Sequence, residues 1–134
     1  MTHVVIIGGG PGGYEAALVG QQLGGKVTLI ERRGMGGAAV LTDVVPSKTL
    51  IATAEVMSQI ARADDLGLCP DQQEPPGRTV ADTITVDLGR VNARIVELAA
   101  QQSVDIRARL LAEGVRIIQG TGRLDGPESV LATH

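Results

Sequence analysis

Three glycines near the amino terminus have the spacing of a loop that could hold a diphosphate. Gly8, Gly10 and Gly13 form the pattern G-x-G-x-x-G, with Pro11 inside it, directly after the apolar run 4–7. The first glycine of such a loop permits a sharp turn, the second lets the backbone approach the diphosphate, and the third lets a helix pack closely on a strand. Free amides and the positive end of the helix dipole would face the anion.

The residues after this loop supply the rest of a strand-helix-strand unit. A helix-like segment over 12–24 leads to a second β-branched apolar strand, 26–30, which ends on Glu31, 18 residues past Gly13. A carboxylate at that place accepts hydrogen bonds from the ribose hydroxyls of an adenosine. Arg32 and Arg33 follow and could bind a 2′-phosphate, but Glu31 would repel it, so we favour solvated arginines and keep Arg32 as a cofactor-binding candidate.

Composition restricts the class of protein. A chain of 134 residues fits one domain, and a net charge of −3 with scattered basic residues does not favour nucleic acid or an anionic membrane as a partner. The single cysteine, Cys69, excludes an internal disulfide, and no apolar run is long enough to span a bilayer. We therefore expect a cytoplasmic protein. With one tyrosine as its only aromatic residue, the chain must bind a cofactor through backbone and polar groups.

The rest of the chain continues the alternation of helix and strand. We expect a glycine-rich loop at 32–37, a helix that begins at or just before Pro46 and runs to about 61, and a surface connector over 67–82. A longer helix over 88–110 is closed by Gly114 and delivers a buried strand at 115–120, and a turn at 125–127 precedes a hairpin arm at 129–133. The apolar stripes at 50–61 and 88–110 are interpreted as core faces. The expected fold is α/β, Rossmann-like, with a parallel sheet.

With these motifs in order, the chain resembles the FAD-binding amino-terminal segment of the pyridine nucleotide-disulfide oxidoreductases, the family of lipoamide dehydrogenase. The family signature G-G-T-C-x-N-x-G-C-x-P-S-K aligns without a gap with residues 36–48, which read GGAAVLTDVVPSK. Ala39 and Val44 replace the two redox cysteines. Because a thiolate is the obligatory nucleophile in disulfide exchange, dithiol chemistry is impossible here. The chain looks instead like the branch of NAD(P)H quinone reductases that lack the disulfide.

The resemblance implies a role for each matching residue. Gly8, Gly10, Pro11 and Gly13 would meet the FAD pyrophosphate and Glu31 the adenosine ribose, while Gly36, Gly37 and Ser47 would line the same loop as Lys48. Lys48 would lie beside the flavin as the catalytic residue, where its charge favours the reduced, anionic form. The implied reaction passes a hydride from NAD(P)H to FAD and electrons onward to a quinone-like acceptor.

Members of the family continue through a nicotinamide domain and a dimerisation domain and form homodimers. The sequence therefore looks like a truncated FAD-binding domain that occupies residues 1–134. Two other functions stay open: a non-catalytic module that binds NAD or ADP-ribose, and an inactive remnant of a gene.

Overall fold

A computed structural model describes residues 2–70 and 75–134 of the chain. Three parallel strands form a sheet in the order β1 (His3–Ile7), β2 (Lys26–Glu31) and β3 (Arg116–Gln119). In this register Ile7 lies beside Ile30 and Glu31 beside Gln119, so the carboxyl ends of all three strands meet at one edge. Ligands of open α/β sheets bind outside this edge.

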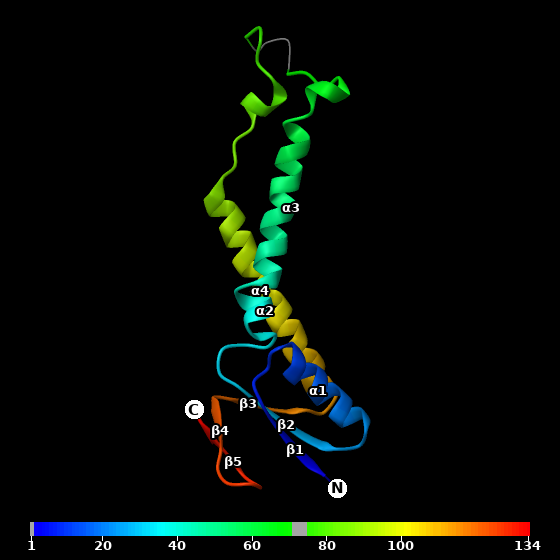
Figure 1. The fold of residues 1–134 in the computed structure, drawn as a ribbon, viewed down its shortest axis with the longest axis vertical. Coiled ribbons are helices and arrows are strands. Elements are labelled where there is room, and N and C mark those ends of the chain that lie inside the picture. Colours follow the sequence, from blue (N-terminus) through cyan, green and yellow to red (C-terminus); the bar gives the residue numbers. More distant parts are fainter. Residues whose placement is uncertain (1, 71–74) are drawn as a thin grey trace.

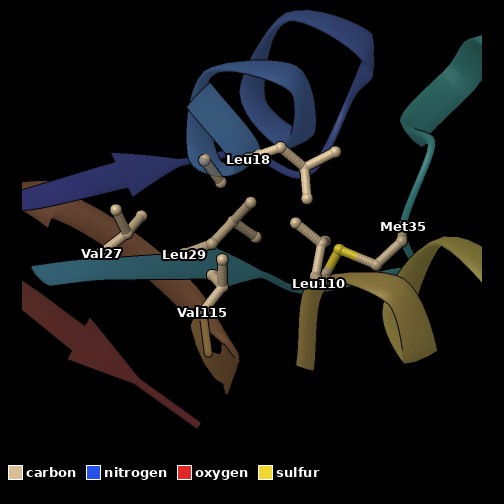
Figure 2. Packing of buried hydrophobic residues seen from close by; sticks show 7 residues of the cluster. Leu18, Val27, Leu29, Met35, Leu110 and Val115 are labelled. Carbon is tan, nitrogen blue, oxygen red and sulfur yellow. The ribbon is translucent and has the colours of Figure 1, made fainter. Parts of the chain in front are cut away.

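The central strand β2 carries the core. Residues 27–30 are all buried, and alternate side chains point to opposite faces of the sheet. Val27 and Leu29 face α1 (Pro11–Gln22) and the carboxyl half of α4 (Leu88–Ala112), where they meet Leu18 and Leu110 (Figure 2). Burying such aliphatic side chains stabilises a fold by about 1.5–3 kcal/mol each.

A two-stranded hairpin covers the other face of the sheet. It consists of β4 (Thr121–Leu124) and the antiparallel β5 (Val130–Thr133), and β4 contacts both β1 and β2. The Cα of Gly122 lies so close to the sheet that an added Cβ would stand 3.1 Å from side-chain atoms of Ile7 and Ile30. The α/β fold class, the parallel sheet and the hairpin arm at 129–133 are therefore confirmed.

A helical arm extends away from the sheet (Figure 1). It contains α3 (Val44–Ile60) and the amino half of α4, which run antiparallel, and the short η1 (Asp64–Leu66) and η2 (Val80–Thr83) lie toward its tip. Residues 71–74 of the expected connector lie outside the described residues.

The interpretation of both apolar stripes as core faces was wrong for α3 and only partly right for α4. No residue of α3 is buried, and Leu50, Ile51 and Val56 are each about half exposed. In α4, Ala99 and Leu110 are buried. The reason is that α3 runs away from the sheet, and its contacts with α2, α4 and η2 leave most of its apolar side chains partly exposed.

The segment between β2 and α3 contains a helix that the sequence analysis did not predict. This helix, α2 (Gly37–Leu41), is five residues long and begins after Gly36, whose φ of 91° lies in the left-handed region. A helix of this length shows no apolar period, and the sequence analysis predicted no element between the loop at 32–37 and the helix near Pro46. The helix at 44–60 does include Pro46 in its first turn, as expected.

Gly13 is the position where the fold itself requires glycine. A Cβ added there would stand 1.9 Å from the carbonyl oxygen of Gly8, an overlap that only a backbone shift could relieve. Gly13→Ala should lower the free energy of unfolding by about 2 kcal/mol or more in urea denaturation. The matched control is Gly12→Ala, because no atom lies within 4 Å of its added Cβ. Equal stability of the two variants would contradict this packing.

Candidate nucleotide-binding site

The glycines of the first loop are required for different reasons. Gly8 has a φ of +102°, a conformation that other residues rarely adopt, and Gly13 is held against Gly8. Gly10 has an ordinary extended backbone, with φ −68° and ψ 178°, and no atom lies within 4 Å of a Cβ added to it. The protein by itself therefore does not require glycine at position 10. The space in front of Gly10 is open, as a close approach of a ligand would demand.

The amides of this loop divide into two groups. The Gly8 amide donates to the Ile30 carbonyl at 2.8 Å, and the Gly9 amide donates to Glu31 Oε2 at 2.7 Å. Gly10, Gly12 and Gly13 occupy the N-cap and first turn of α1, where amides have no intrahelical partner. In the described part of the chain no other group accepts from these three amides. They form a ready site for an anion at the positive end of the helix.

The carboxylate of Glu31 points back to the loop. Oε2 accepts from the Gly9 amide, and Oε1 accepts from the amides of Arg33 at 2.7 Å and Gly34 at 3.4 Å. Partial burial acts to raise the pKa of Glu31, but the backbone amides around it outweigh this and hold the pKa below its ordinary value of 4.5. Glu31 is thus a carboxylate that fixes the glycine loop, with lone pairs left for a sugar hydroxyl.

A second glycine loop braces the first. The Gly36 amide donates to the Gly9 carbonyl at 2.7 Å, and Gly37 lies so near that its added Cβ would stand 3.0 Å from the Cα of Gly10. Beneath them, the buried side chain of Met35 leaves no room for a Cβ on Gly9, which would stand 2.7 Å from the sulfur. Gly36 and Gly37 therefore lie beside the first glycine loop.

A pocket of about 250 Å³ opens where the three strands end. It is lined by residues that precede and follow the strand ends, namely Ile7, Gly8, Ile30, Glu31, Arg32, Gly120, Thr121 and Gly122. Sequence reasoning missed 120–122, although a third parallel strand at 115–120 had to deliver its carboxyl end to this edge. The Gln119 amide nitrogen Nε2 donates to the Arg32 carbonyl at 2.8 Å and so ties β3 to the residue after Glu31.

Pro11, Ser47 and Lys48 do not line this pocket. Pro11 is the exposed first residue of α1. Ser47 and Lys48 are exposed in the first turns of α3, and Lys48 lines a groove between α3 and α4. Gly8, Glu31 and Arg32 thus line the pocket, the loops beside it hold Gly10, Pro11, Gly13, Gly36 and Gly37, and Ser47 and Lys48 lie on α3 outside it.

The cysteine positions of the family signature fall in helices. Ala39 lies in α2, and Val44 is the first residue of α3. The chain's single cysteine, Cys69, is exposed and follows η1, beyond the carboxyl end of α3. No pair of thiols is present to carry electrons.

The hydrogen bonds of Glu31 predict a pH-dependent contribution to stability. Glu31→Gln should lower the free energy of unfolding by about 1–3 kcal/mol at pH 7, because a charged acceptor is lost. A folded pKa below 4.5 means that the contribution is complete above pH 4.5 and is lost as the pH falls through the folded value. Urea denaturation of both proteins at pH 7 and at acid pH measures it.

The control for this prediction is Glu15→Gln, which changes an exposed glutamate on α1 that accepts no hydrogen bond from the described residues. It should leave stability unchanged at both pH values. A difference between the wild type and Glu31→Gln that stays constant down to pH 2 would contradict the account of Glu31.

Comparisons with known proteins cover the whole described fold. Residues 2–133 match the family described as pyridine nucleotide-disulphide oxidoreductase. The chain is 44% identical to an NAD(P)H dehydrogenase (quinone) of Mycobacterium tuberculosis, over 100% of this chain and 26% of the relative. It is 32% identical to a dihydrolipoyl dehydrogenase of Zymomonas mobilis, over 96% of this chain and 25% of that enzyme.

A solved structure agrees with these relatives. The crystal structure of LpdA from Mycobacterium tuberculosis is 42% identical in sequence and superimposes with a TM-score of 0.78, over 94% of this chain and 25% of that one. The chain thus spans about a quarter of the length of these relatives. Within the described residues no helix is both long and apolar enough to cross a bilayer. The match over residues 2–133 shows that the chain belongs to the pyridine nucleotide-disulphide oxidoreductase family.

Proposed function

We propose that this chain is the FAD-binding amino-terminal part of an FAD-dependent NAD(P)H oxidoreductase that uses no dithiol. Family membership supports the flavin and the nicotinamide, and the relative named NAD(P)H dehydrogenase (quinone) supports a quinone-like acceptor. The replacement of both signature cysteines by Ala39 and Val44 favours direct transfer from flavin over disulfide exchange. The observation that carries the proposal is the set of amides at Gly10, Gly12 and Gly13 without an acceptor in the described residues, at the positive end of α1 and beside the Glu31 carboxylate.

The site suits the adenosine diphosphate half of FAD. The diphosphate lies against the amides of Gly10, Gly12 and Gly13, whose donors are free and stand at the positive end of α1. Glu31 accepts from the ribose hydroxyls while the Gly9 amide holds its carboxylate in place. Residues 120–122, with Arg32, would form the walls of the adenine pocket. Binding rests on backbone and polar groups, because Tyr14 is the only aromatic residue among Phe, Tyr and Trp.

The residues of α2 and α3 that face this edge would hold the flavin half. A bound flavin supplies the hydride acceptor that this chain's own side chains lack. Gly36 and Gly37 line its path, Ser47 stands in the first turn of α3, and Lys48 places a positive charge beside the ring. Arg32 contributes to the wall of the adenosine pocket.

In this proposal residues 1–134 are one part of a larger FAD-binding domain, with a connector at about 67–82. The nicotinamide site and the dimer contacts belong to regions of the relatives that this chain does not match, because it spans about a quarter of their length.

Gly10→Ala separates ligand binding from folding. Because the added Cβ meets no atom within 4 Å, the variant should melt like the wild type. The same Cβ would stand in the diphosphate space and should weaken FAD binding at least tenfold, or about 1.4 kcal/mol, in isothermal titration calorimetry. The control Ser58→Ala, at an exposed position near the carboxyl end of α3, should retain FAD affinity within about threefold.

Titration of NAD under the same conditions tests the nearest alternative. Tighter binding of NAD than of FAD would favour a nucleotide-binding module without flavin chemistry. Absence of FAD binding by the folded wild type, or equal affinity of Gly10→Ala and the wild type, would contradict the proposal.

The role of Lys48 is tested by the reduction potential of bound FAD, which reports the charge beside the flavin rather than the affinity for it. Lys48→Met keeps the length of the side chain and removes its charge, so it should lower the reduction potential of bound FAD because the anionic reduced flavin loses its stabilisation. FAD affinity should stay within a few-fold. The reduction potential is measured by redox titration with a reference dye, and Arg107→Met on α4 is the control. An unchanged potential in Lys48→Met would place Lys48 away from the flavin.

A further inference from the structure

Gln119 holds the turn after β2 from a position outside the strand-end pocket. It is the last residue of β3, lies beside Glu31 in the sheet, and donates from its side-chain Nε2 to the Arg32 carbonyl at 2.8 Å. The side chain is exposed, so burial does not force it to make this hydrogen bond. We propose that Gln119 is a positioning residue that prepares Glu31 to select a nucleotide with free ribose hydroxyls. This inference rests on the proposed function, because it takes the nucleotide to bind at the strand ends.

The link from Gln119 to Glu31 runs through a single peptide group. The Arg32 carbonyl and the Arg33 amide belong to the same planar trans peptide, so the C=O and the N–H point in opposite directions. Gln119 donates to the carbonyl on one side, and the Arg33 amide donates to Glu31 Oε1 at 2.7 Å on the other. Fixing the carbonyl therefore also fixes the direction of the N–H. Hydrogen bonds in such a chain polarise one another.

The Arg33 amide decides which oxygen of Glu31 is left for a ligand. Oε1 accepts from the amides of Arg33 and, at 3.4 Å, of Gly34, so both of its lone pairs are engaged. Oε2 accepts from the Gly9 amide at 2.7 Å and keeps a second lone pair. The acceptor offered to a ribose hydroxyl is therefore on Oε2, and its direction depends on the hold that Arg33 has on Oε1.

Loss of the Gln119 donor should release the peptide group without separating the strands. The Gly120 amide donates to the Glu31 carbonyl at 2.9 Å, and this backbone bond does not need the Gln119 side chain. The Arg33 amide would lose its fixed direction toward the carboxylate. Partial burial acts to raise the pKa of Glu31, and the Arg33 amide is the largest of the influences that lower it. A change at Gln119 should therefore be felt at Glu31.

The pKa of Glu31 tests the peptide link without any ligand. Gln119→Leu keeps most of the bulk of the side chain and removes its donor, so the pKa of Glu31 should rise from its lowered value toward 4.5. Carbon NMR of the Glu31 carboxyl during acid titration of the 134-residue chain measures it. The control Gln22→Leu, at the exposed last residue of α1, should leave this pKa unchanged.

Recognition of the ribose is measured with ADP and 2′,3′-dideoxy-ADP, which differ only in the two ribose hydroxyls. In isothermal titration calorimetry the wild type should bind ADP at least about tenfold more tightly, because a hydroxyl donates to a charged acceptor. In Gln119→Leu this preference should fall to within about threefold. Affinity for dideoxy-ADP should stay close to that of the wild type, since the amides of Gly10, Gly12 and Gly13 are untouched.

Gln119→Lys is the rescue variant. Its ammonium group can donate to the Arg32 carbonyl, so the preference for ADP over dideoxy-ADP should return close to that of the wild type. The added charge acts on both nucleotides alike and cancels in the ratio of their affinities. Gln22→Leu should keep both affinities, and circular dichroism with melting establishes that each variant is folded.

The inference is overturned if the pKa of Glu31 is the same in folded Gln119→Leu and in the wild type. It is also overturned if Gln119→Leu keeps the full preference for ADP, or if it loses affinity for both nucleotides equally, as a purely structural role predicts. Failure of the folded wild type to bind ADP would refute the proposed function, and the ribose role with it. Normal binding of ADP by the wild type with an unaltered Gln119→Leu would refute this inference alone.

Discussion

The hydrogen bonds between the Glu31 carboxylate and the backbone amides around it decide the shape of the nucleotide site. One oxygen holds Gly9 and the other holds Arg33 and Gly34, so a single side chain joins the first loop to the turn after β2. The amides that Glu31 takes are not the ones offered to a ligand, because those of Gly10, Gly12 and Gly13 remain without an acceptor in the described residues. The same charge thus orders the loop and leaves its anion-binding side open. This arrangement follows from where β2 ends, since residue 31 lies directly beyond the buried run 27–30.

Much of this site could be predicted from the sequence because it is encoded locally. The glycine spacing and the acid that ends the second strand depend only on one strand-helix-strand unit, and parallel pairing fixes their relation in space. Residues 120–122 depend on a contact between distant parts of the chain, and their pocket became evident only with β3 in register beside β2. The sequence pattern also does not show that its three glycines are needed for different reasons. Position 13 serves packing, position 8 serves backbone conformation, and position 10 is free of both demands.

In the helical arm, the spacing of apolar residues predicted the helices but not their contacts. Apolar residues at helical spacing correctly predicted a helix over most of 44–60, but not what that helix contacts. Apolar residues at helical spacing show only that one face of the helix is apolar. That face can pack on a sheet, on another helix or on another molecule. In α3 the apolar side chains remain largely exposed, whereas in α4 the buried residues Ala99 and Leu110 lie toward the sheet end. The five-residue α2 was missed for another reason, because a single turn of helix is shorter than the window that reveals a period.

The most direct test is amide NMR of the chain titrated with ADP, the smallest molecule that carries both the ribose and the diphosphate of FAD. The account predicts the largest shifts at Gly10, Gly12 and Gly13, because their free amides would donate to the diphosphate. The Gly9 amide should keep its exchange protection, since its acceptor is Glu31 before and after binding. Shifts centred elsewhere, or loss of protection at Gly9 on binding, would contradict the claim that Glu31 holds the loop ready for a diphosphate.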